Sequence, residues 1–183
     1  FSRALRSLMR QDPDIILVGE TRDKETAQAA MEAALTGHMV FTTLHANDTA
    51  TAITRLAEME IPPYLIGASI IGVVAQRLVR KVCKSCTDFR KIDKRENQLA
   101  FSFGVEKARF INKKNTSCPI CNGSGYKGRV GIYEVMKVND FIRDLIMNQS
   151  NADQIREKAF EKNGRSLLAV SYTHLTLPTI LLV

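Results

Sequence analysis

The chain has 183 residues, of which 45% are hydrophobic and 25% are charged, an ordinary globular composition that supplies one medium core or two small ones. No apolar stretch approaches the roughly 20 residues that a membrane-spanning helix needs. The first residues, FSRALRSLMRQD, are basic and amphipathic and lack the apolar segment of a signal peptide. The given sequence therefore offers no candidate membrane-spanning helix and no sign of export.

Apolar spacing and turn residues in the first 60 residues predict an α/β unit with a parallel sheet. The run from Ile15 to Gly19 is entirely apolar, which is typical of a strand covered on both faces. Asp23 is placed to cap one helix, and Asn47 or Asp48 another. In chain order we expect a helix end at residues 3–10, a strand at 15–19, a helix at 22–37, a strand at 38–45 and a helix at 47–59.

The second half of the chain contains different elements. After two prolines, apolar and then basic residues predict one long helix from Tyr64 to Val82. Four cysteines follow, with a polar insert over residues 87–117 between the two pairs. Two further helices, at residues 138–149 and 151–164, begin at capping residues.

The end of the chain breaks these patterns. SYTHLTLPTILLV is uncharged and looks like translated sequencing-adapter DNA, so we expect residues 171–183 to be a non-native tail. The expected domains are an α/β part at 1–80, a tetracysteine region at 81–135 and a helical region at 136–168.

The strand at 15–19 ends in charged residues, which points to a site. Glu20 and Arg22 follow the apolar run directly, and α/β sheets bind ligands at the carboxyl ends of their parallel strands. In phosphate-cleaving sites a carboxylate there holds Mg²⁺ through water or aligns the attacking water. Gly19 lets phosphate or another backbone approach closely. The structural alternative is an edge glutamate that pairs with Arg22.

Two histidines bracket the second expected strand. His38 is its first residue and His45 its last, and both lie beside turn or capping residues rather than core residues. Imidazole donors at the same crevice contact phosphate oxygens in nucleotide sites. A single histidine at a strand end is usually structural, but two around one strand favour a nucleotide site.

Three stretches together resemble one family. LRSLMRQDPDIILVGETRDKETA resembles the signature of the type II secretion and type IV pilus assembly ATPases, and LTGHMVFTTLHANDTATAITRL resembles their histidine box. AQRLVRKVCKSC and CPICNGSGYKGRVGIYEV resemble their tetracysteine region. The resemblance covers residue 1 to about residue 168. It implies a partial RecA-like P-loop NTPase core of α/β class with a parallel sheet, followed by a four-cysteine zinc-binding subdomain and C-terminal helices.

The resemblance also implies roles for single residues. Glu20 matches the catalytic Walker B glutamate, and His45 matches the histidine that contacts the γ-phosphate, with ATP and Mg²⁺ as cofactors. Thr21 replaces an aliphatic residue that is common in the family, a departure that leaves this chemistry unchanged. The residues implied to lie near the nucleotide are Gly19, Arg22 and His38.

The family's P-loop, G-x-x-x-x-G-K-[ST], has no match in this sequence. We therefore expect the chain to be the C-terminal half of a motor and to be inactive alone. By resemblance, the intact protein is a cytoplasmic homohexamer, peripheral at the inner membrane, that couples ATP hydrolysis to pilin or pseudopilin assembly. Its implied partners are an inner-membrane platform protein and cytoplasmic assembly components. The resemblance implies no specific nucleic-acid partner. A retraction motor is the alternative within the family, but the cysteines favour the assembly or secretion branch.

Four cysteines form two C-x-x-C pairs, Cys83 with Cys86 and Cys118 with Cys121. Two such pairs close a tetrahedral site of four thiolates, which is typical of structural Zn²⁺. Without an export signal, these cysteines favour a reducing compartment and a metal over disulfides. The alternatives are redox chemistry at one pair, which a helix preceding Cys83 disfavours, and the C-x-x-C-x-G-x-G knuckle of chaperone zinc domains.

The net charge of +7 is concentrated beside the first cysteine pair, where residues 77–95 carry eight basic and two acidic side chains. The plain interpretation is a solvated basic loop next to a metal site. The alternative function is a zinc-dependent nucleic-acid or protein-binding module without ATPase activity. Steeply salt-dependent binding to nonspecific DNA would favour that alternative.

Overall fold

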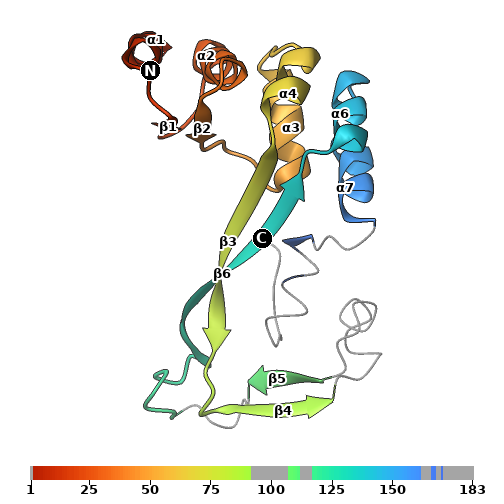
Figure 1. Cartoon of the computed structure of the whole chain (residues 1–183). Coiled ribbons are helices and arrows are strands. Elements are labelled where there is room, and N and C mark those ends of the chain that lie inside the picture. The colour runs from red at the N-terminus through yellow and green to blue at the C-terminus, as the bar shows by residue number, and fades with distance from the viewer. Residues whose placement is uncertain (1, 92–106, 112–116, 162–165, 168–169, 171–183) are drawn as a thin grey trace. The chain divides into compact units, whose positions relative to one another are not determined.

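The computed structural model describes residues 2–91, 107–111, 117–161, 166–167 and 170, with the backbone alone at residues 87–90 and 107–111. The chain forms two compact units (Figure 1). The first comprises residues 1–75 and 135–164, and the second comprises residues 76–134 and 165–183. Within the described ranges, none of the helices has both the length and the apolar character needed to cross a membrane.

The first unit begins with alternating helices and strands, as the sequence predicts. Strands β1 (Ile15–Val18) and β2 (Met39–Thr42) pair in parallel, with Ile15 opposite Met39 and Val18 opposite Thr42. The expected α/β class with a parallel sheet is confirmed. The helices of this unit are α1 (Ser2–Leu8), the 3-10 turn η1 (Met9–Gln11), α2 (Lys24–Leu35), α3 (Thr49–Glu58), α4 (Pro63–Ser69), α6 (Asp140–Met147) and α7 (Ala152–Phe160).

Strand β1 is covered on only one face by the part of the chain that the structure describes. Ile16 and Val18 are buried in a cluster with residues of α1 and α2. Ile15 and Leu17, on the other face, are 65% and 77% exposed. The unbroken apolar run predicts coverage on both faces, and for these residues that prediction is wrong.

Asp23 and Asp48 cap the N-termini of α2 and α3. The Asp23 carboxylate accepts a hydrogen bond from the backbone N–H of Thr26, and that of Asp48 accepts one from Thr51, both at 2.8 Å. The predicted cap at Asp23 is confirmed, and of the two candidates for α3 the structure selects Asp48 over Asn47. These caps start α2 and α3 a few residues beyond the two strand ends.

We expect acid to weaken the fold partly through these two caps. Hydrogen bonds from the N–H and hydroxyl of Thr26 lower the pKa of Asp23 below its ordinary 3.8. Burial raises the pKa of Asp48, but hydrogen bonds from Thr51 and Arg156 outweigh burial and lower it. Because both folded pKa values lie below the unfolded ones, the stabilisation is present above about pH 4 and is lost as pH falls through the folded values.

The double variant Asp23→Asn/Asp48→Asn tests this expectation, because asparagine caps a helix without a titrating group. Its melting temperature, followed by circular dichroism, should fall less steeply than that of the wild type between about pH 5 and about pH 2. Equal slopes for the two proteins would contradict the role given to the two carboxylates.

The stretch from Tyr64 to Val82 does not form the single helix that its composition predicts. As a result, the first cysteine pair follows a strand and not a helix. Helix α4 ends at Ser69, and strand β3 (Gly72–Val82) follows and pairs with β6 (Tyr126–Lys137). Four of the five residues in Ile70–Val74 are β-branched, and such side chains lose rotamer freedom in a helix but fit a pleated strand. Pairing with β6 then decides the conformation.

The polar insert contains a third strand pair. Strands β4 (Thr87–Lys91) and β5 (Lys107–Ile111) run antiparallel, with Thr87 opposite Ile111. The expected non-native tail, residues 171–183, lies outside the described residues.

The two helices predicted near the end of the chain are confirmed. Asn139 caps α6, and Asn151 caps α7 through a reciprocal pair of bonds with Gln154. Ile142 of α6 and Ile155 of α7 are each 1% exposed and lie in the main core cluster with residues of α2, α3 and α4. This packing fixes α7 against α3.

Candidate functional site

The structure brings Glu20, Arg22 and His45 together at one edge of the β1–β2 sheet. Glu20 lies two residues beyond β1 and His45 three residues beyond β2, and parallel strands deliver their carboxyl ends to the same edge. Oε2 of Glu20 lies 3.5 Å from Nε2 of His45 and 2.7 Å from Nε of Arg22. The glutamate side chain is 33% exposed, and the histidine and arginine are 84% and 69% exposed. A carboxylate therefore faces solvent between two nitrogen donors.

Hydrogen bonds between the two strand ends hold Glu20 from both sides. On one side, the Thr43 hydroxyl donates to the Gly19 carbonyl at 2.6 Å. On the other, the N–H of Thr21 donates to the Thr43 carbonyl at 2.9 Å, and the hydroxyls of Thr21 and Thr42 are hydrogen-bonded at 2.8 Å. Because these bonds flank Glu20 in the chain, its backbone is fixed relative to the strand that leads to His45.

Sequence reasoning missed this set of threonines. The resemblance treats Thr21 as a neutral departure, but it is 3% exposed and its hydroxyl joins the two strand ends. The pair Thr42-Thr43 at the end of an apolar strand is the signal that was available, since threonine hydroxyls at a strand end can hydrogen-bond to the neighbouring strand end.

Gly19 and His38 occupy different surroundings. A Cβ atom added to Gly19 would meet no described atom within 4 Å, so the space beside Glu20 is open on that side. His38 precedes β2 rather than following it, and its Nδ1 lies 3.0 Å from the carbonyl oxygen of Ala33 and 3.2 Å from the hydroxyl of Thr36. The structure thus places His38 at the C-terminal end of α2, at the opposite end of β2 from His45. Its proximity to nucleotide stays a prediction.

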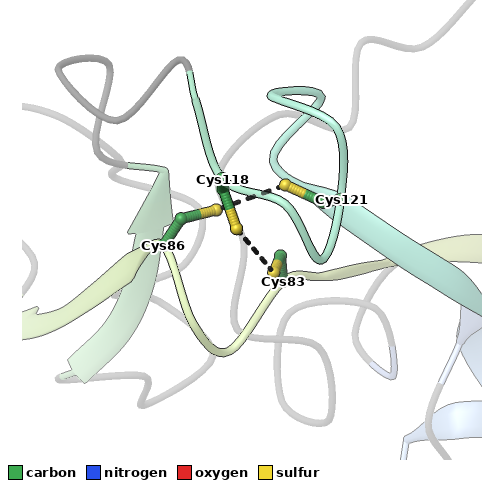
Figure 2. Close-up of side chains that lie close together, drawn as sticks. All are labelled: Cys83, Cys86, Cys118 and Cys121. Atoms are coloured by element: carbon green, nitrogen blue, oxygen red, sulfur yellow. Dashed lines mark hydrogen bonds between the residues drawn. The ribbon is translucent and has the colours of Figure 1, made fainter.

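The four cysteines form one buried cluster in the second unit (Figure 2). Their sulfur atoms all lie within 4.8 Å of one another, with Cys83 and Cys118 at 4.0 Å and Cys86 and Cys121 at 3.5 Å. Zn–S bonds of about 2.3 Å in a tetrahedron place sulfur atoms roughly 3.8 Å apart. The cluster therefore has the size and the ligand chemistry of a structural zinc site, and its four cysteines are free of disulfides.

Backbone hydrogen bonds shape the two turns that present the cysteines. The N–H of Cys83, directly after β3, donates to the Gly125 carbonyl at 2.8 Å. The N–H of Gly125 donates to the Cys121 sulfur at 3.3 Å, and that of Gly123 donates to the Cys118 carbonyl at 3.2 Å. Both glycines have φ of 75°, a left-handed conformation that other residues adopt only with strain. The glycine-rich stretch after Cys121 therefore folds back onto the sulfur atoms.

The thiols of this cluster share protons unequally. Burial disfavours charge on Cys121, but hydrogen bonds from the Gly125 N–H and the neighbouring thiols outweigh it and lower the pKa of Cys121 to about 7. At Cys86 burial has the largest effect on the pKa, and hydrogen bonds with the neighbouring thiols act in the same direction. Together they raise the pKa of Cys86 to about 12. A divalent cation bound among the four sulfur atoms would replace these protons.

The sequence argument against a redox role for the first pair depends on a helix before Cys83. Strand β3 precedes this residue instead, so that part of the reasoning is wrong. Neither pair opens a helix among the described elements, which still separates this cluster from a thioredoxin-like site.

Three of the eight basic residues of the stretch beside the first pair lie on β3. Arg77, Arg80, Lys81 and Lys84 are exposed. The Arg80 guanidinium lies 4.1 Å from the centre of the Tyr126 ring, a cation–π contact between β3 and β6. This arrangement fits the plain interpretation of a solvated basic face.

Comparisons with known proteins agree with the resemblance seen in the motifs. The profile of the family "Type II/IV secretion system protein" matches residues 1–177. The chain is 46% identical over 166 residues to type II secretion system ATPase E of Vibrio cholerae, covering 91% of this chain and 32% of that protein. It is 50% identical over 169 residues to type IV pilus assembly ATPase PilB of Thermus thermophilus, covering 91% of this chain and 19% of that protein. It therefore spans a third or less of the length of these two relatives.

Solved structures support the same conclusion. The pilus retraction motor PilT with bound ADP superposes with a TM-score of 0.53 at 26% identity, covering 94% of this chain and 43% of that chain. The Legionella pneumophila ATPase DotB superposes with a TM-score of 0.57 at 24% identity, covering 91% and 36%, and shows the likeness of fold alone. The chain belongs to the type II/IV secretion system protein family, whose named relatives include secretion and pilus ATPases.

Proposed function

We propose that the intact protein is a motor ATPase and that this chain supplies the half of its catalytic edge that acts on the attacking water and the γ-phosphate. The observation that carries the proposal is the Glu20 carboxylate, held 3.5 Å from His45 where two parallel strands end. This is the edge at which α/β sheets bind ligands. The identity of 46% and 50% to two proteins named as ATPases supports it.

In the proposed mechanism each residue acts from the position described above. Glu20 orients the attacking water and takes its proton, since a partly exposed carboxylate is a suitable base. Arg22 holds Oε2 of Glu20 in place. His45 donates to a phosphate oxygen as charge develops there. Mg²⁺ bound with the nucleotide would neutralise charge on the phosphates, and carboxylate oxygens such as those of Glu20 suit it as ligands, directly or through water.

The wider role is also a proposal. We infer that the intact protein works as a homohexamer, peripheral to the inner membrane on the cytoplasmic side, and couples ATP hydrolysis to pilin or pseudopilin assembly with a platform protein. Support comes from the names of the relatives, one a secretion ATPase and the other a pilus assembly ATPase. The retraction motor PilT is less similar, at 26% identity. The cysteine cluster is proposed to hold one structural Zn²⁺.

We expect the isolated 183-residue chain not to hydrolyse ATP, whereas the intact protein does. The reason is that the sequence has no P-loop, whose backbone N–H groups and lysine supply most of the phosphate binding in these enzymes. Phosphate release by the purified chain and by the intact protein, measured side by side with a nucleotide titration, tests both statements. Turnover by the chain that disappears in Glu20→Gln would overturn the first, and an intact protein that neither binds nor hydrolyses ATP would overturn the proposed function.

A further inference from the structure

The loop between β2 and α3, residues 43–48, carries His45 and is fixed at both ends. At its start, Thr43 is hydrogen-bonded to Gly19 and Thr21 at the end of β1. At its end, Oδ1 of Asp48 caps α3. Because the His45 side chain is 84% exposed, packing contributes little to its position. The two anchors of the loop therefore set where the imidazole lies.

The second anchor extends to a distant helix. Oδ2 of Asp48 accepts a hydrogen bond of 2.8 Å from Nη2 of Arg156 on α7, 108 residues further along the chain. The two side chains are 21% and 35% exposed, whereas the Lys158–Glu161 pair on the same helix is 49% and 53% exposed. An ion pair that is better shielded from water holds its geometry more firmly than an exposed one. One carboxylate thus joins the helix cap, the loop and α7.

Arg156 is itself held in place. The preceding residue, Ile155, is 1% exposed and packs in the main core. Nη1 of Arg156 donates to Asp153 at 2.5 Å, one turn earlier on α7. The guanidinium is therefore held firmly on α7, and a displacement of α7 relative to α3 would pull on Asp48.

We propose that Arg156 is a positioning residue for hydrolysis: through Asp48 it fixes the loop that presents His45 to the γ-phosphate. The inference rests on the function proposed above for His45 and adds that α7 participates in the geometry of the catalytic edge. A purely structural ion pair would stabilise the packing of α7 without affecting the rate of turnover. The two roles therefore predict different values of kcat for a variant that lacks the ion pair.

The test uses the intact protein and the variant Arg156→Met, which keeps an apolar stem and removes the guanidinium. We expect kcat for ATP hydrolysis to fall roughly tenfold, because small displacements of a group that acts in the transition state have large effects on rate. KM for ATP should stay within about twofold, since His45 is proposed to act as charge develops in the transition state. Asp48→Asn, which keeps the cap and loses the charge, should lower kcat similarly. The double variant should be no slower than the slower single variant, because both act through one pair.

The matched control is Lys158→Met, which breaks an exposed ion pair on the same helix and should keep wild-type kcat. Arg156→Lys should restore part of the lost rate. If Arg156→Met and Asp48→Asn are folded and turn over at the wild-type rate, the inference is wrong, even if their melting temperatures fall. Should Arg156→Met not fold, Asp48→Asn decides the question. Wild-type turnover in both Glu20→Gln and His45→Ala would instead overturn the proposed function itself.

Discussion

Glu20→Gln in the intact protein should keep nucleotide binding and lower kcat for ATP hydrolysis by about 10²–10⁴-fold, the usual contribution of a positioned general base. The amide has the shape of the carboxylate but neither its charge nor its basicity. It therefore loses the charge-assisted contact with Arg22, whose Nε lies 2.7 Å from Oε2 in the wild type, and the carboxylate that lies 3.5 Å from Nε2 of His45. Phosphate release at saturating ATP gives kcat, and titration with a fluorescent nucleotide gives affinity.

Glu32→Gln is a suitable control for this variant, because Glu32 is an exposed residue of α2 whose hydrogen bond goes to Gln28 on the same helix. It should hydrolyse ATP at the wild-type rate. A smaller effect is expected for His45→Ala, since loss of one donor to the phosphate leaves the base in place. Wild-type turnover in Glu20→Gln would show that the glutamate only pairs with Arg22, which was the structural alternative for this residue.

The juxtaposition of Glu20 and His45 was accessible from the sequence because it depends only on local patterns. Each residue follows an apolar run that forms a strand, and parallel strands bring such positions to one edge. The position of His38 was less accessible, because the residue just before a strand lies at the opposite end from the residue just after it. Its hydrogen bonds to Ala33 and Thr36 depend on where α2 ends.

Contacts between distant segments could not be predicted in this way. Arg156 and Asp48 are 108 residues apart. In the sequence, Arg156 looks like an ordinary basic residue on the surface of a helix, and Asp48 looks like an ordinary helix cap. The pairing of β3 with β6 likewise decides the conformation of Gly72–Val82, where an apolar and then basic pattern suggested a helix. The caps at Asp23 and Asn151 were predictable because a cap needs only its own next three residues.

The exposed face of β1 shows how burial depends on more than the strand's own residues. Ile15 and Leu17 have the same apolar character as Ile16 and Val18. Only the latter pair meets α1 and α2 within the described chain. An apolar run thus predicts a strand well, but which of its faces are covered depends on elements that lie elsewhere.

The cysteine cluster depends both on a local sequence pattern and on contacts between distant segments. Two C-x-x-C pairs predict a four-sulfur site from spacing alone, and the structure brings all four sulfur atoms within 4.8 Å of one another. The structure adds that these four residues make up the buried cluster of the second unit, which otherwise buries only Gly125, Ile132 and Glu134 among its described residues. The part of the unit that the structure describes therefore has very little apolar core with which to hold its two cysteine turns together.

Removal of the metal should consequently unfold the region from about Lys81 to Tyr133, and we expect the purified protein to contain one Zn²⁺ per chain. Structural zinc contributes about 10–16 kcal/mol in zinc-finger peptides, as much as the roughly 5–15 kcal/mol that stabilises a whole domain. Elemental analysis gives the stoichiometry. Hydrogen exchange with and without a chelator locates the damage, and the informative amides are those of Cys83, Gly123 and Gly125, which donate to the Gly125 carbonyl, the Cys118 carbonyl and the Cys121 sulfur.

Amides of the first unit serve as the internal reference. The N–H groups of Ile61 and Ile66 donate to Leu56 and Pro62 within the main core and should keep their protection when the metal is removed. Cys121→Ser should reproduce the effect of the chelator, because three sulfur ligands and a hydroxyl bind zinc less tightly than four thiolates. Ser85→Ala, an exposed position inside the first C-x-x-C, should retain both zinc and protection. Protein prepared under reducing conditions that contains no zinc, yet protects the same three amides fully, would show that hydrogen bonds alone hold these turns and that the cysteines serve no metal.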